Sequence, residues 1–178
     1  GLSRFAHRAR AFVKIQDGCK APCRYCIIPQ TRSTYWSKPV EHVLNEVQTL
    51  VEGGHGEIVF TGIRLGLYRG PSREGERADL THLLKKIIQL PGPFRLRLSS
   101  LEVTEIPDEL IQLAAGTDKI CAHFHIPLQS ADDDVLKAMG RWYRFADYED
   151  RVGAVRRLLP DAAVTGDVLT GFPTETDA

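Results

Sequence analysis

Residues 11–26 read AFVKIQDGCKAPCRYC, a short strand-like run that leads directly into three closely spaced cysteines. Cys19, Cys23 and Cys26 have the spacing C-x3-C-x2-C, and Gly18 gives their loop the backbone freedom to wrap around an inorganic core. Cysteine thiolates are the usual ligands of iron–sulfur clusters. Three thiolates on a four-iron cluster leave one iron open, so the pattern predicts a [4Fe–4S] cluster that can bind a further ligand.

A zinc site is the main alternative for these cysteines. A structural zinc site needs four ligands and commonly pairs two C-x2-C hairpins, but the only other cysteine is Cys121. We expect Cys121 at the start of the fourth strand, at the opposite end of a parallel sheet from the cysteine loop. It is therefore a poor fourth ligand and is interpreted as a small buried apolar residue. The iron–sulfur cluster is favoured, with zinc and an unligated loop as alternatives.

Strand and helix patterns alternate along the rest of the chain. Apolar periodicity, punctuated by Gly and Pro, defines the expected elements. The strands are expected at residues 11–16, 57–61, 95–99, 119–126 and 163–170, and the helices at residues 40–51, 80–90, 108–115, 132–139 and 148–159. Repeated strand–helix units predict an α/β fold with a parallel sheet, either open or part of a barrel. We expect one domain spanning residues 1–178, with residues 70–78 as a flexible insertion.

The predicted strands end in residues suited to a shared site. Ligands of parallel α/β folds bind at the carboxyl ends of the strands. Besides the cysteine loop, these ends carry Thr61-Gly62, residues 99–102 (SSLE), residues 127–130 (PLQS) and residues 167–173. Single strand ends often carry Gly and Ser as turn formers, but their agreement predicts one site at this edge.

Three further groups allow a structural and a functional interpretation. His123 and His125 share a face of the fourth strand and are interpreted as hydrogen-bonded residues inside a barrel, although His125, nearer the strand's end, could place a cofactor or substrate. Tyr35-Trp36 is either a stacking surface for a base or a hydrophobic anchor. A second basic group is interpreted as a solvated helix end: Lys137, Arg141 and Arg144.

Composition is that of a globular protein, with 43% apolar and 26% charged residues and a net charge of zero. No run of about 18 apolar residues predicts a membrane helix, and the start GLSRFAHRAR lacks the apolar core of a secretory signal. We therefore expect a cytoplasmic protein, and a chain cut from a longer one. Residues 1–40 hold eight Lys or Arg and one acid, Asp17. This basic stretch predicts either a solvated face or contact with a phosphate-rich partner.

Ordered motifs over nearly the whole chain resemble the methylthiotransferase family of radical S-adenosylmethionine enzymes. GCKAPCRYCIIP resembles the cluster loop of the superfamily. AFVKIQDGC, TGIRLGLY, RLRLSSLE, HIPLQS with a following LKAMGR-Y, and VLTGFPTET resemble the methylthiotransferases in order. KIQDGC, TGIRLG and SSLE are most similar to the branch acting on threonylcarbamoyl-adenosine in tRNA, beside the anticodon. The resemblance implies a partial (β/α)6 barrel, truncated after its fifth strand.

The resemblance also implies roles for single residues. The three loop cysteines would bind three irons, and the fourth iron would chelate the amino and carboxylate groups of S-adenosylmethionine. Tyr25 would lie beside the adenine, and Thr61-Gly62 would present backbone groups to the methionine amine. Further candidates for ribose and methionine contacts are Ser100, Glu102, Gln129 and Asp167. Candidates for RNA contact are Arg24, Arg32 and Lys38.

The implied chemistry begins with one electron, supplied by a donor such as a flavodoxin or ferredoxin. It would break the sulfonium bond and yield a 5′-deoxyadenosyl radical, which takes a hydrogen from the substrate base before sulfur is inserted. The family has an N-terminal domain with three further cysteines for a second cluster and a C-terminal RNA-binding domain. Neither is expected in this chain, so its own affinity for tRNA should be weak.

Some residues depart from the family pattern. Residues 31–39 read TRSTYWSKP where several arginines are usual, and Ala131 and Thr174 stand where glycines are usual. Two alternatives remain, one within radical chemistry and one outside it. The first is a ribosomal-protein methylthiotransferase or another radical S-adenosylmethionine enzyme. The second is a non-catalytic module in which zinc or a cluster braces an RNA-binding surface.

Overall fold

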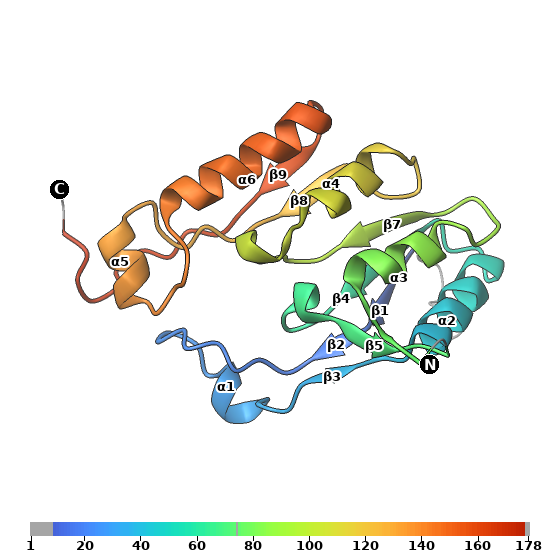
Figure 1. Cartoon of the computed structure of the whole chain (residues 1–178), viewed down its shortest axis with the longest axis horizontal. Helices are drawn as coiled ribbons and strands as arrows, with labels where there is room; N and C mark the ends of the chain where they lie inside the picture. Colours follow the sequence, from blue (N-terminus) through green and yellow to red (C-terminus); the bar gives the residue numbers. More distant parts are fainter. Residues whose placement is uncertain (1–8, 74, 177–178) are drawn as a thin grey trace.

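The computed structural model describes residues 9–73 and 75–176, which form a curved parallel sheet with helices along one face (Figure 1). Strands β1 (Arg10–Lys14), β4 (Glu57–Thr61) and β7 (Arg95–Leu98) pair in parallel. Strands β8 (His123–His125) and β9 (Ala163–Thr165) form a second parallel pair. Isolated parallel bridges join β7 to the β8 region, between Leu96 and Ile120 and between Ser100 and His125. The strands therefore follow one another in chain order, which confirms the predicted α/β fold and fits part of a barrel.

Four helices cover one face of this sheet, and each contacts the next (Figure 1). They are α2 (Val40–Glu52), α3 (Leu80–Ile87), α4 (Asp108–Ala115) and α6 (Phe145–Leu158). Two shorter helices, α1 (Ile28–Thr31) and α5 (Asp133–Ala138), lie at the end where the strands finish. Aspartates fix two of the helix starts: Asp79 accepts from the His82 amide and Asp132 from the Val135 amide. None of the helices in the described residues has the length and apolar character that a membrane span requires.

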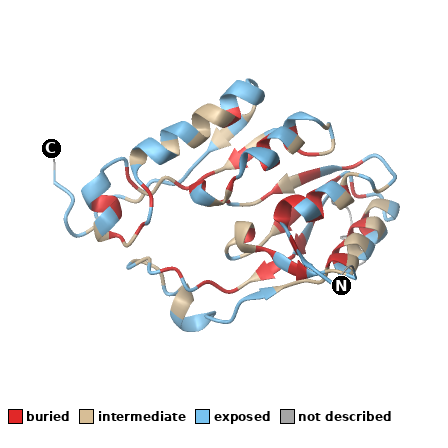
Figure 2. Ribbon diagram, in the orientation of Figure 1, coloured by how far each residue is buried: buried red, intermediate tan, exposed pale blue. Residues whose placement is uncertain are grey.

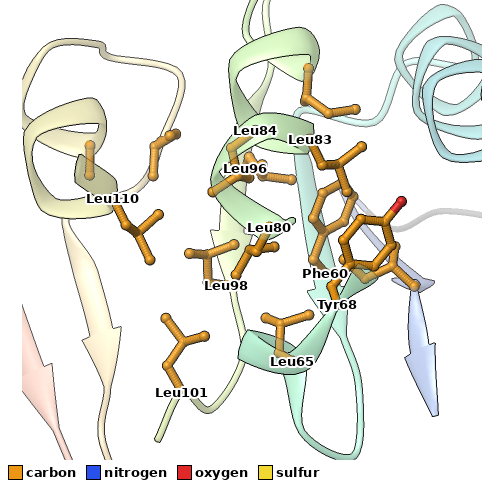
Figure 3. Close-up of a cluster of buried hydrophobic side chains, with 14 of the residues drawn as sticks. Phe60, Leu65, Tyr68, Leu80, Leu83, Leu84, Leu96, Leu98, Leu101 and Leu110 are labelled. Atoms are coloured by element: carbon orange, nitrogen blue, oxygen red, sulfur yellow. The ribbon is translucent and has the colours of Figure 1, made fainter. Parts of the chain in front are cut away.

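The core lies between the sheet and the four covering helices (Figure 2). In β1, Ala11 and Val13 are fully buried beneath the helices, whereas the alternate residues are exposed on the other face. Figure 3 shows Leu80, Leu83 and Leu84 of α3 packed among side chains from β4 and β7. Truncating a buried leucine of this kind to alanine costs about 2–5 kcal/mol.

Several elements differ from their predicted bounds. The fourth and fifth strands are much shorter than residues 119–126 and 163–170. The expected flexible insertion is instead flanked by an antiparallel hairpin of β5 (Arg69–Pro71) and β6 (Arg77–Asp79). Helix α6 begins three residues earlier than expected, where the Asp147 carboxylate in its first turn accepts from the Arg144 backbone amide at 2.8 Å.

The first strand also ends sooner than expected, at Lys14. The next residues form a separate strand, β2 (Gln16–Asp17), which pairs antiparallel with β3 (Trp36–Ser37). This small ribbon leaves the main sheet and carries the cysteine loop beyond its edge (Figure 1). Two 3-10 turns complete the same end of the molecule: η1 (Leu65–Leu67) after β4 and η2 (Val103–Glu105) after β7.

Candidate functional site

The loops that follow the strands gather at one end of the sheet, together with α1 and α5 (Figure 1). The cysteine loop lies between β2 and α1. Gly18 opens this loop with φ +85°, a left-handed conformation that favours glycine. A Cβ atom at Gly18 would lie 2.0 Å from the Thr34 carbonyl oxygen, so a larger residue would displace that segment. The Cys19 amide then donates to the Arg32 carbonyl at 2.9 Å, which closes the loop against the chain that follows it.

Gln16 fixes the start of the loop, and sequence reasoning did not single it out. Its side-chain amide donates to the carbonyls of Asp17 and Gly18, at 2.9 and 2.8 Å. Its Oε1 accepts from the Arg64 amide at 2.7 Å, and the residue is 1% exposed. A Cβ atom on Gly62 would lie 2.9 Å from this oxygen. The close approach expected at Gly62 is thus made by Gln16, which links the cysteine loop to the end of β4.

All four cysteines lie within the described residues, and all are free thiols. Cys19 is buried and its sulfur accepts from the Ala21 amide at 3.4 Å, whereas Cys23 and Cys26 are partly exposed. No three His, Cys, Asp or Glu side chains of residues 9–73 and 75–176 come together around a single metal ion. An iron–sulfur cubane binds each thiolate at a separate iron, so its ligands do not have to converge on one point. Three free thiols on one loop, with N–H donors aimed at two of the sulfurs, fit such a cluster.

Arg141 is the second donor to a cysteine sulfur, and its expected role as part of a solvated helix end is wrong. Its guanidinium donates to Cys23 Sγ and to the Tyr25 hydroxyl, both at 3.2 Å, and pairs with Glu102. The residue is 8% exposed. Lys137 and Arg144, the other members of that group, are exposed as predicted.

The local backbone explains why Arg141 turns inward. Gly140 before it has φ +78°, and a Cβ atom there would lie 2.4 Å from the Pro22 carbonyl oxygen. The Arg24 amide also donates to the Met139 carbonyl at 2.9 Å. The turn after α5 is therefore packed against the cysteine loop, which delivers the Arg141 side chain to Cys23. The motif LKAMGR-Y contains both the glycine of this turn and the buried arginine, but its positive charges alone suggested a solvated face.

Electrostatics favour a charged guanidinium at this position. Burial, the largest single influence, would lower the pKa of Arg141, but the charges of Glu102, Tyr143, Tyr25 and Cys23 together outweigh it and hold the pKa above its usual value. Burial raises the pKa of Tyr25, so the neutral phenol can accept from Arg141. The Arg141 Nε is buried without a partner. Trp142 stacks with two guanidinium groups, at 4.7 Å from Arg141 and 4.5 Å from Arg64.

A second group of predicted residues meets at the ends of β7, β8 and β9. His125 contacts the Thr165 hydroxyl through Nδ1 at 3.0 Å and Asp167 Oδ2 through Nε2 at 3.2 Å. Ser100 forms a β-bridge with His125, and the Gln129 amide donates to the Asp167 carbonyl at 2.9 Å. The structure therefore brings Ser100, His125, Gln129 and Asp167 together, while Glu102 and Tyr25 lie with Arg141. His123 keeps a buried Nδ1 without a partner, and burial lowers its pKa.

A cavity of about 600 Å³ adjoins the cysteine loop. Arg24 and Tyr25 line one part of it, and Ala138 of α5, Leu169 and residues 171–174 line the rest. Phe172 and Pro173 are among the lining residues, so the cavity offers apolar and aromatic surface beside Tyr25. This is the place where the resemblance puts a planar base.

The three candidates for RNA contact have different surroundings. Arg24 lines the cavity described above. Arg32 pairs with Asp17 at 3.3 Å, and Lys38 pairs with Glu46 at 2.5 Å, where both side chains are about one-fifth exposed. Part of the basic N-terminal stretch, including Arg4 and Arg8, lies outside the described residues.

The opposite end of the sheet holds Cys121, as the topology predicted. Its sulfur lies 4.0 Å from Glu57 Oε2, and Glu57 is the first residue of β4. Three arginines surround this carboxylate: Arg10 at 2.7 Å, Arg97 at 2.8 Å and Arg95 at 3.5 Å. Burial raises the pKa of the Cys121 thiol.

Comparison with known proteins gives similarities over nearly the whole chain. The Radical SAM superfamily matches residues 13–178. The threonylcarbamoyladenosine tRNA methylthiotransferases MtaB of Thermotoga maritima and Bacillus subtilis are 41% and 42% identical over 98% and 97% of this chain. A tRNA-2-methylthio-N(6)-dimethylallyladenosine synthase of Acinetobacter baumannii is 38% identical over 94%. The chain spans 39%, 38% and 35% of the length of these three relatives, in the same order.

Solved structures support the fold. The radical S-adenosylmethionine methyltransferase TsrM of Kitasatospora setae superposes with a TM-score of 0.66 at 18% identity, over 89% of this chain and 30% of TsrM. The cobalamin-dependent S-adenosylmethionine radical enzyme OxsB superposes with a TM-score of 0.66 at 12% identity, over 88% of this chain and 23% of OxsB. At these identities the likeness concerns the fold alone.

Proposed function

Because this chain belongs to the radical SAM superfamily, we propose that it is the catalytic core of a tRNA methylthiotransferase. One observation carries the proposal: a loop with three free cysteines is packed against an inward-turned arginine at the carboxyl end of a parallel sheet. In parallel α/β folds this is the end at which chemistry takes place. The similarity to tRNA methylthiotransferases adds the reaction class.

Cys19, Cys23 and Cys26 would hold a [4Fe–4S] cluster, with S-adenosylmethionine at its open iron. When bound, this pair supplies the one-electron cleavage of the sulfonium bond that produces a 5′-deoxyadenosyl radical and methionine. Gln16 and Arg141 position the cysteine loop, since they contact its backbone and the Cys23 sulfur. The Arg141 guanidinium also places fixed positive charge beside a sulfur that must be a thiolate, which favours ligation.

The remaining residues of the site would orient S-adenosylmethionine. Tyr25 and the apolar cavity beside it suit a planar adenine ring. The polar groups at the strand ends suit hydroxyl, amine and carboxylate groups. The residues proposed for these contacts are Thr61, Gly62, Ser100, Glu102, Gln129 and Asp167.

The substrate we propose is a modified adenosine of tRNA, of the threonylcarbamoyl type. The support is the identity of 41–42% to two threonylcarbamoyladenosine enzymes. Arg24, Arg32 and Lys38 would contact the RNA, and a flavodoxin or ferredoxin would donate the electron. Sulfur insertion needs a further sulfur source, and only Cys121 is left among the four cysteines of this chain. We therefore expect the chain to cleave S-adenosylmethionine without adding sulfur to tRNA.

Anaerobic reconstitution with iron and sulfide tests the proposal. We expect about four irons and four sulfides per chain, and release of 5′-deoxyadenosine when dithionite and S-adenosylmethionine are added. Mass spectrometry of nucleosides from added threonylcarbamoylated tRNA should show no methylthio product. One zinc and no sulfide would refute the assignment as an enzyme. A catalytic yield of methylthio product would refute the need for a separate sulfur source.

A further inference from the structure

The segment after α1 carries two exposed aromatic side chains that the proposed radical chemistry does not use. Tyr35 and Trp36 are 44% and 45% exposed. Ile27, at the end of the cysteine loop, is 59% exposed. Three of the eight large apolar side chains exposed within the described residues thus fall within residues 27–36. Of these, Tyr35 and Trp36 are neighbours in the chain and both rings are exposed, which makes them candidates for an interaction site. We call residues 31–37 the aromatic arm; it lies among exposed and partly exposed residues in Figure 2.

The aromatic arm is fixed to the cysteine loop at several points. Trp36 pairs with Asp17 in the β2–β3 ribbon. The Thr34 carbonyl packs against Gly18, where no side chain fits. The Tyr35 hydroxyl accepts from the Lys20 amide at 3.0 Å, and the Lys20 ammonium lies 5.7 Å from the Tyr35 ring centroid. The Tyr35 ring and the backbone of Trp36 are therefore held beside the cysteine loop before any partner arrives, which lowers the entropy cost of binding.

Charge around the arm favours a polyanion. Residues 14–40 contain five Lys or Arg and one acid, Asp17. Asp17 compensates Lys14 and Arg32, and Glu46 compensates Lys38. Lys20 and Arg24 add further positive charge on the cysteine loop itself. A partner with negative charge and flat apolar faces satisfies both the cations and the aromatic rings, and unpaired nucleotides of an RNA have both properties.

We propose that Tyr35 and Trp36 are a stacking surface for unpaired bases of the RNA substrate, next to the cysteine loop. This deepens the proposed function, because it names the part of the RNA that the chain holds. The segment reads TRSTYWSKP, with an aromatic pair between one arginine and one lysine. Affinity for RNA should therefore depend on stacking as well as on salt.

Tryptophan fluorescence tests the stacking directly. The chain has two tryptophans, so the variant Trp142→Phe leaves Trp36 as the sole reporter. We expect a single-stranded oligoribonucleotide or an anticodon stem–loop to quench its emission, and inorganic polyphosphate to bind without quenching. With Trp142 intact, Trp36→Ala should weaken the affinity for labelled RNA about 10-fold, which corresponds to one lost base stack. Trp36→Phe keeps a ring and should lose much less.

Phe12→Ala is the matched control, because Phe12 is 50% exposed but lies in β1, away from the aromatic arm. It should leave RNA affinity unchanged. The proposal is overturned if RNA does not bind, if it binds without quenching Trp36, or if Trp36→Ala binds as tightly as the unchanged chain. Quenching by an acidic protein but not by RNA would also overturn it. The titration requires no cleavage of S-adenosylmethionine, so its result is independent of the iron and sulfide assay.

Discussion

The two ends of the sheet hold the same three kinds of side chain in different roles. At the carboxyl end, Cys23 accepts a hydrogen bond from Arg141, which also pairs with Glu102. At the amino end, Cys121 lies beside Glu57, which pairs with Arg97. The sulfur meets a cation at one end and a carboxylate at the other. Residue type therefore does not identify the reactive thiol in this fold; the partner that the topology brings to the sulfur does.

The two ends also differ in the charged groups that surround the sulfur. Burial is the main cause of the raised pKa of Cys121; Arg97 opposes it and Glu57 adds to it. The thiol therefore stays protonated and suits packing rather than metal binding. Its carboxylate neighbour pairs with three arginines, whereas among the described residues Arg141 is the one guanidinium that contacts Cys23, Tyr25 and Glu102. The amino end can lose one arginine and keep its carboxylate paired; the carboxyl end cannot.

The largest expected effect comes from removing the thiols one at a time. Cys19→Ala, Cys23→Ala and Cys26→Ala should each abolish the brown chromophore and the cleavage of S-adenosylmethionine, because each removes one of three ligands. Cys121→Ala should leave both intact, since this thiol lies at the other end of the sheet. Visible absorbance and iron content after reconstitution measure the difference. Loss of the chromophore in Cys121→Ala would show that the thiol at the amino end also supports the cluster, and would contradict the comparison.

The next effect concerns the arginines. Arg141→Gln leaves Glu102 without its partner in a site where the Arg141 side chain is 2% exposed. Breaking a buried pair on one side costs about 3–5 kcal/mol. Arg97→Gln leaves Glu57 paired with Arg10 and Arg95, which are half exposed or more, and should cost about 1 kcal/mol. Urea unfolding of the cluster-free chain measures both, and equal losses would contradict the comparison.

The fold was largely predictable because its signals are local. Apolar spacing in residues 40–51 and 108–115 matches α2 and α4 closely. The short strands were overestimated, because β8 and β9 pair over three residues only and the flanking chain turns away. The ribbon of β2 and β3 was missed, since its pairing depends on contact between the cysteine loop and a segment that follows it.

The site was predictable to the extent that spacing along the chain defines it. The cysteine loop could be predicted because its three cysteines lie close together in the sequence. Arg141 is 118 residues away from Cys23 in the sequence. Its burial depends on a tertiary contact, the packing of Gly140 against Pro22, and the sequence does not show that contact. Gln16 was overlooked for the same reason, because its partner is the amide of Arg64, 48 residues along the chain.

A smaller effect is expected on thiol reactivity. In the cluster-free chain, iodoacetamide should alkylate Cys121 more slowly than Cys23, by about 10-fold, because a raised pKa leaves less thiolate and the residue is 8% exposed. Peptide mass spectrometry over time gives both rates. Alkylation of Cys121 before Cys23 would show that the reactive thiol lies at the amino end of the sheet.

The smallest effect is the acid sensitivity of the amino end. The Arg97 hydrogen bond, opposed by burial and aided by the charges of Arg97, Arg10 and Arg95, holds the pKa of Glu57 below its usual value of 4.5. A carboxylate whose folded-state pKa is lowered stabilises the fold at any pH above its unfolded-state pKa, and this stability is lost as pH falls through the folded-state pKa.

Glu57→Gln should therefore lower the free energy of unfolding by about 1 kcal/mol at neutral pH. The difference between the two proteins should shrink as pH falls below about 4.5. His123, whose pKa burial lowers, is present in both chains, so most of its titration cancels in this difference. Urea unfolding from pH 7 to pH 3 measures it, and a difference that stays constant or grows toward acid would show that Glu57 is not held ionised by its arginines.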